Sequence, residues 1–156
     1  MTELFPSVGW FRSLADRMAA APEKYRKLGA LDLTLLPRIT FPDGRAELFS
    51  LAFEGNGCRT VERVERPDAI TGRHPVILEG EYAAWREMIE NIRRHGHADL
   101  QHTLNYLTLP DWPFRLLPVK EDGQLDVDRF YRFNETLQEY FDEAARVDTR
   151  FVANGG

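Results

Sequence analysis

Three of the four histidines lie close together in the second half of the chain, beside an aspartate. The four side chains with potential metal-binding atoms are His95, His97, Asp99 and His102. Imidazole and carboxylate groups at close spacing suit Zn²⁺ or Fe²⁺, and a bound metal would activate a water molecule for hydrolysis. On a helix, three of the four would share one face and His97 would point elsewhere. The segment therefore defines one hypothesis, a metal-dependent hydrolase or isomerase.

The same segment also carries the signals of a helix end. Arg93, Arg94 and His95 supply positive charge, which complements the C-terminus of a helix. Gly96 is typical of the residue that follows a helix. On these general signals we favour the helix-end interpretation over a metal site.

Other residues give weaker signals for chemistry. Cys58 follows a glycine turn, and a reactive thiolate would need a base that the sequence does not supply, so we expect a small buried side chain. Asp126 and Asp128 fit the cap and the solvated face of a helix. The segment Gly55-Asn56-Gly57 lacks the spaced glycines and the lysine of a phosphate-binding loop and fits a hairpin turn. We therefore expect no catalytic residues and no cofactor, and we leave enzymatic activity open.

The composition predicts a single globular domain over 1–156. The chain has 156 residues, 43% of them hydrophobic, and a net charge of −5 without a basic cluster, which excludes nucleic acid as a partner. No apolar run approaches the roughly 18 residues of a membrane span, so we do not expect an integral membrane protein. The single cysteine and the lack of a signal sequence at the start favour a cytoplasmic location. We expect a core over about 5–146 and a frayed tail over 147–156.

The scaffold that must position these residues is predicted to be an α+β fold. Apolar residues at helical spacing predict helices from an N-cap at Ser7 to Pro22, over 80–94 and over 127–146. Alternation and turn residues such as Pro42-Asp43-Gly44 predict strands that include 31–35, 48–53, 58–65, 76–78 and 103–109, with a short apolar run over 114–119. We expect a sheet of about five strands, mainly antiparallel, covered on one face by amphipathic helices.

The apolar faces of the last two long helices are rich in aromatic residues. On base rates such faces pack on a sheet as a filled core. Two amphipathic helices on one sheet face can also leave an apolar slot, which suits an acyl chain or a flat ring system. The predicted lining residues are Phe53, Trp85, Met88, Ile89, Tyr106, Phe130, Phe133, Asn134, Leu137 and Phe141. The amides of Asn105 and Asn134 would pair with partners inside the core or meet the polar head of a ligand.

The order of elements resembles the sterol carrier protein type-two domain family. The resemblance spans residues 5–145 and rests on the Asp43-Gly44 turn, on Glu79-Gly80-Glu81-Tyr82-Ala83-Ala84-Trp85-Arg86-Glu87-Met88-Ile89 after a short strand, and on the closing helix. It implies an SCP-2-like fold, with a five-stranded sheet and an apolar tunnel for fatty acids, acyl-CoA, sterols or other lipids, and no catalytic residues. The family usually continues with a glycine-rich turn and a basic-apolar strand, where this chain has 98–105.

Three hypotheses follow from the sequence. The first is a carrier that binds a hydrophobic small molecule between the sheet and the helices over 80–94 and 127–146. The second is the metal-dependent enzyme of the histidine segment. The third is a non-catalytic interaction subunit that docks onto itself or onto a larger enzyme, and it leaves a homodimer open.

Overall fold

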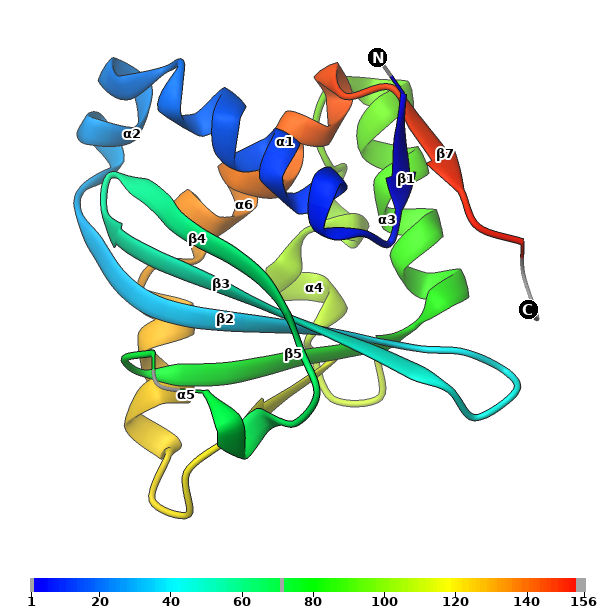
Figure 1. The fold of residues 1–156 in the computed structure, drawn as a ribbon. Coiled ribbons are helices and arrows are strands. Elements are labelled where there is room, and N and C mark those ends of the chain that lie inside the picture. Colours follow the sequence, from blue (N-terminus) through cyan, green and yellow to red (C-terminus); the bar gives the residue numbers. More distant parts are fainter. Residues whose placement is uncertain (1, 71, 154–156) are drawn as a thin grey trace.

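The computed structural model describes residues 2–70 and 72–153, and its helices pack against one face of a five-stranded sheet (Figure 1). The sheet has the order β4-β3-β2-β5-β6. Its strands are β2 (Leu31–Thr40), β3 (Ala46–Gly55), β4 (Gly57–Val64), β5 (Pro75–Glu81) and β6 (Arg115–Pro118). β2 and β5 are parallel, and the other neighbouring pairs are antiparallel. The predicted α+β fold with a mainly antiparallel, five-stranded sheet is therefore confirmed.

The hairpin turns depend on glycine where the sequence predicts them. Gly44, between β2 and β3, has φ of +92°, and Gly55, before β4, has φ of +65°. Both values lie in the region that side chains with a Cβ rarely adopt. The turns fix the antiparallel register of the first three sheet strands.

Two helices begin and end on the local signals seen in the sequence. α1 (Val8–Ala19) starts at Ser7, whose Oγ accepts a hydrogen bond from the backbone N–H of Trp10 at 3.0 Å. α3 (Tyr82–His95) follows β5 directly and stops at Gly96, which has φ of +83°. The helix-end interpretation of the histidine segment is therefore confirmed for Gly96.

α2 (Pro22–Leu28) is a short helix in a segment without a predicted element. It is anchored by Tyr25, which is fully buried and donates a hydrogen bond to the carboxylate of Glu143 at 2.6 Å. Lys24 lies 2.9 Å from the same carboxylate. Burial and the nearby carboxylate raise the pKa of the Tyr25 phenol, so this side chain remains a hydrogen-bond donor.

The predicted strand over 103–109 is wrong. The structure has a 3-10 helix, η2 (Leu100–His102), and a short helix, α4 (Leu104–Leu107). The Oγ1 of Thr103 accepts a hydrogen bond from the backbone N–H of Tyr106 at 3.4 Å and caps α4. Leu104 and Leu107 are both buried, which is the i, i+3 spacing of a helix, so the apparent alternation was misleading.

The predicted closing helix over 127–146 is broken into three pieces. These are α5 (Gln124–Arg132), α6 (Asn134–Asp142) and the 3-10 helix η3 (Glu143–Arg146). The break falls at Phe133, which has φ of −102° and ψ of 15°. There the side chain of Asn134 donates to the backbone carbonyl of Tyr131 at 2.5 Å, a local bond that competes with a continuous helix.

Residues 149–151 of the predicted frayed tail form a strand. β7 (Thr149–Phe151) pairs in parallel with β1 (Glu3–Phe5), and Figure 1 shows the two strands side by side. The Oγ1 of Thr149 also accepts a hydrogen bond from the indole of Trp10 at 3.0 Å. The core therefore extends beyond the predicted boundary at 146, while residues 154–156 of the predicted tail lie outside the described residues.

Each face of the sheet carries an apolar cluster. The larger cluster fills the space between the sheet and the helices. The smaller cluster, on the opposite face, consists of Leu36, Leu48 and Ile77, with Ile70 of the connection after β4 packed against it. The candidate site lies within the larger cluster.

Candidate functional site

Seven of the ten predicted lining residues meet in one apolar layer between the sheet and the helices. They are Phe53 on β3, Trp85, Met88 and Ile89 on α3, Phe130 on α5, and Leu137 and Phe141 on α6, and all of them are buried. All seven belong to the main core cluster. We call this group of seven the apolar layer.

Trp85 lies at the centre of aromatic contacts in the apolar layer. Its ring is 4.8 Å from that of Phe114, edge to face, and 6.0 Å from that of Phe141. Its indole N–H donates to the backbone carbonyl of Arg38 on β2 at 3.3 Å. The side chain therefore links α3 to the sheet and to α6.

Phe114 is a neighbour of Trp85 that was not predicted as a lining residue. Its ring lies over Gly80 at the end of β5, where an added Cβ would come within 2.6 Å of the ring carbons. A small residue is thus required where β5 runs into α3. The apolar run over 114–119 was the available signal, but the sequence does not show which strand it faces.

Tyr140 is a second unpredicted member of this environment. Its ring lies 5.1 Å from that of Phe53, edge to face, and its hydroxyl donates to the backbone carbonyl of Phe11 at 2.8 Å. Burial raises the pKa of the Tyr140 phenol well above its ordinary value. The hydroxyl is therefore neutral and is already used within the fold.

The remaining three predicted residues lie at the edge of the layer. Tyr106 on α4, and Phe133 and Asn134 at the break between α5 and α6, are only half-buried. The amide of Asn105 donates to that of Asn134 at 3.5 Å, so the two amides pair with each other at the surface, not inside the core. Tyr106 contacts the partly exposed ring of Trp112, with centroids 5.8 Å apart. We call Tyr106, Phe133 and Asn134 the rim of the layer.

Solved structures with a similar fold cover nearly the whole chain. A crystal structure of sterol carrier protein 2 matches 89% of this chain and 95% of its own, with 17% identity and a TM-score of 0.59. The chain has the fold of sterol carrier protein 2. A solution structure of a conserved hypothetical protein from Thermus thermophilus is also similar, with 18% identity, a TM-score of 0.60, and coverage of 99% of this chain and 94% of that chain. No family model and no curated protein matches the sequence.

Within this sterol carrier protein 2 fold, side chains of the apolar layer pack against one another. Five hollows on the described surface have lining residues that do not include any of the ten predicted ones. One of the five, of about 190 Å³, lies beside Phe41, Pro42 and Tyr82. The layer and the rim therefore remain a predicted ligand site.

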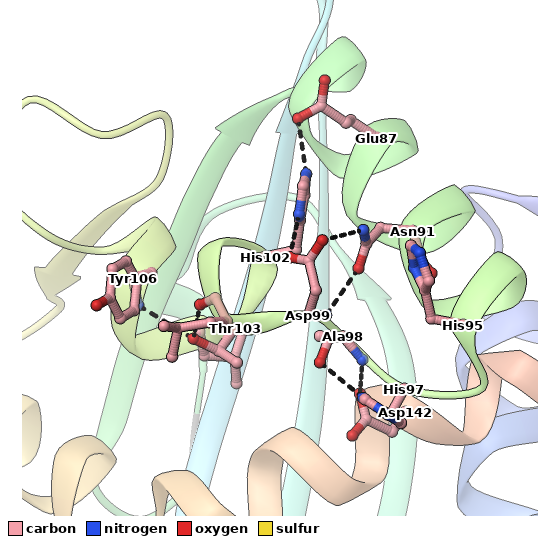
Figure 2. Close-up of polar contacts among 12 residues, drawn as sticks. Glu87, Asn91, His95, His97, Ala98, Asp99, His102, Thr103, Tyr106 and Asp142 are labelled. Carbon is pink, nitrogen blue, oxygen red and sulfur yellow. Dashed lines mark hydrogen bonds and ion pairs between the residues drawn. The ribbon is translucent and has the colours of Figure 1, made fainter.

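The four side chains of the alternative metal hypothesis bond other groups of the chain (Figure 2). His95 bonds the backbone carbonyl of Asn91 through Nδ1 at 2.9 Å, and His97 bonds that of Ala98 at 2.9 Å. Asp99 and His102 bond each other at 2.6 Å. Within 2–70 and 72–153, no three histidine, cysteine or carboxylate side chains are grouped to hold a metal ion.

The other candidates for chemistry have structural roles. Cys58 is half-buried, not buried as predicted. Its surroundings still raise the pKa of the thiol to about 12 by desolvation, and its Sγ donates to the backbone carbonyl of Thr60 at 3.5 Å. Asp126 is buried and bonds Nδ1 of His74 at 3.0 Å, while Asp128 accepts from the amide of Gln124 at 2.9 Å. In the described part of the chain, no helix has the length and hydropathy needed to cross a membrane.

Proposed function

We propose that the protein binds and carries a hydrophobic small molecule, either a fatty acid, an acyl-CoA, a sterol or another lipid. The observation that carries the proposal is the fold: a structure named sterol carrier protein 2 matches this chain over most of its length. The apolar layer supports it, because a continuous set of aromatic and aliphatic side chains between a sheet and two helices suits an apolar ligand.

The ten predicted lining residues are the proposed ligand contacts. Seven would contact the apolar body of the ligand, and the rim would lie nearest to solvent. Side chains at the rim are only half-buried and have few polar partners: Asn134 accepts from the amide of Asn105 at 3.5 Å and donates to the backbone carbonyl of Tyr131 at 2.5 Å. A ligand that enters at the rim would therefore break fewer contacts than one that enters through the buried apolar layer.

A fluorescent fatty acid provides a direct test. Dansylaminoundecanoic acid is titrated into the protein, and the blue shift of the dansyl emission reports transfer into an apolar site. Native mass spectrometry of the same sample gives the number of molecules bound. One saturable site supports a carrier, and a protein that gains neither emission nor mass would refute the proposed function.

A matched pair of variants tests the location of the site. Phe133→Asp places a charge at the rim, where an apolar ligand would lose contact, so its affinity should fall at least about tenfold. Leu125→Asp introduces the same change on exposed surface of the neighbouring α5 and should bind as wild type. Far-ultraviolet circular dichroism confirms folding, and Tyr106→Asp repeats the test from α4. Equal affinity in Phe133→Asp, Tyr106→Asp and Leu125→Asp would exclude the rim.

A further inference from the structure

His102 bridges two carboxylates at the connection between α3 and α4 (Figure 2). Its Nδ1 lies 2.6 Å from Oδ1 of Asp99, and its Nε2 lies 3.0 Å from Oε2 of Glu87 on α3. A carboxylate accepts hydrogen bonds but does not donate them. Both ring nitrogens can donate only when the imidazole is protonated, so the geometry fits the imidazolium and not the neutral ring.

The carboxylate of Asp99 is itself held in place from α3. It accepts a hydrogen bond from the amide of Asn91 at 2.8 Å, and the backbone N–H of Asp99 donates to the same amide at 2.9 Å. The hydrogen bonds from His102 and Asn91 lower the pKa of Asp99 to about 2. Asp99 therefore keeps its negative charge over the whole range in which a histidine titrates.

The connection also contacts α6, so it joins two helices of the apolar layer. The backbone N–H of Ala98 donates to Asp142 at 3.1 Å, and that of Leu104 donates to Gln138 at 2.7 Å. On the α3 side, the polar contacts are the ion pair of His102 with Glu87 and the hydrogen bonds between the Asn91 amide and Asp99. Loss of the positive charge on His102 would thus weaken the contact with α3 while the contacts with α6 remain.

The other charged groups near His102 partly cancel one another. A surface hollow beside it is lined by α3, and its titratable or charged members are Tyr82, Arg86, Glu87, Glu90 and Arg94. Arg86 and Glu90 lie 3.4 Å apart as an ion pair. Burial disfavours the charge on His102, but the hydrogen bonds that the ring donates to Asp99 and Glu87 outweigh burial and raise the pKa of the ring.

We propose that protonated His102 is a clamp that holds the α3–α4 connection against α3 and that releases it when the ring loses its proton. The clamp is complete below the ordinary pKa of histidine, near 6.5, and weakens as the pH rises through the raised value. This proposal concerns the connection alone and does not depend on the bound molecule.

The clamp is tested by NMR on the full chain. Titration of the His102 ring protons gives its pKa, expected above 6.5. Amide exchange gives protection at Asp99 and His102, whose backbone N–H groups bond the Asn91 amide and Asp99. After correction for the intrinsic rate, protection should fall about tenfold between pH 5.5 and 8.5, as expected for loss of a charge-assisted contact.

Variants separate the clamp from general effects of pH. In His102→Gln the side chain does not titrate. The exchange protection of the amides at positions 99 and 102 should therefore not fall between pH 5.5 and 8.5. His97→Gln, the matched control, changes a ring that bonds only the adjacent Ala98 carbonyl and should behave as wild type. Glu87→Gln removes one of the two carboxylates and should lower the His102 pKa. A His102 pKa at or below 6.5, or the same step in His102→Gln, would overturn the proposal.

Discussion

Gly80→Ala should destabilise the fold by forcing apart the aromatic contacts around Trp85. The new Cβ would lie 2.6 Å from two ring carbons of Phe114, where ordinary contacts begin near 3.4 Å. The ring has little room to move, because Phe114 is almost completely buried and packs edge to face on Trp85 at 4.8 Å. Relief therefore requires a displacement of Phe114, and with it of the central side chain of the apolar layer.

The expected cost follows from overpacking. Methyl groups forced into a filled core destabilise proteins by about 1–3 kcal/mol. Gly80 does not have a positive φ, so alanine can adopt its backbone and recovers up to about 1 kcal/mol by restricting the unfolded chain. We expect a net loss of about 1–2 kcal/mol in the free energy of unfolding. In urea this corresponds to a midpoint lower by roughly 0.5–1 M, followed by circular dichroism.

A double-mutant cycle identifies Phe114 as the cause. Phe114→Val removes the ring atoms that meet the new Cβ and should cost about 2–4 kcal/mol by itself. In that background Gly80→Ala should cost nothing, which gives a coupling energy of about 1–2 kcal/mol. Gly57→Ala is the matched control, because a Cβ there meets no atom within 4 Å. A Gly80→Ala penalty that persists in the Phe114→Val background would refute the reasoning.

Three further predictions concern the buried polar groups and the cap. Glu143→Gln should lower the free energy of unfolding by about 2 kcal/mol. Glu139 is half-exposed, so the control Glu139→Gln should lower it by at most about 0.5 kcal/mol. Burial opposes the charge of Glu143, but Tyr25 and Lys24 outweigh burial and lower the pKa of this carboxyl group. The difference in stability between wild type and Glu143→Gln should therefore shrink as the pH falls below 4.5. Cys58 has a pKa of about 12, so at pH 8 it should react with iodoacetamide at least about a hundredfold more slowly than a free thiol. Urea should abolish this difference, and mass spectrometry measures the rate of alkylation with and without urea. Ser7→Ala should cost about 1 kcal/mol in urea unfolding, and a similar loss in the mid-helix control Ser13→Ala would contradict a capping role.

The elements that the sequence predicts well are those with signals inside a few residues. Ser7 caps α1, Gly44 closes the first hairpin, and α3 shows its apolar face at helical spacing before it stops at Gly96. Each of these features depends on a side chain and its nearest neighbours in the chain. Local patterns were therefore sufficient for these elements.

The errors fall where short segments depend on distant partners. β1 and β7 are three residues each and exist because they pair across almost the entire chain. α4 has four residues, and the backbone N–H of Leu104 donates to the side chain of Gln138 on α6. A local sequence pattern does not predict this contact. The break at Phe133 is a different case: it coincides with a local bond from the side chain of Asn134 to the backbone carbonyl of Tyr131, which an amphipathic pattern does not detect. Sequence periodicity cannot resolve such features, because it averages over longer windows.

The candidate site shows the same limit in a different form. An apolar helix face has the same spacing whether it packs against a sheet or against a ligand, so Trp85 and Phe141 fit both interpretations. The structure fills the layer with ring contacts, and a ligand would have to replace them. If only a small fraction of molecules is open at one time, the apparent dissociation constant rises by the inverse of that fraction. Binding that strengthens in a variant loosened only at the rim would therefore indicate a closed layer that opens to admit its ligand, whereas unchanged binding would indicate that opening is not limiting.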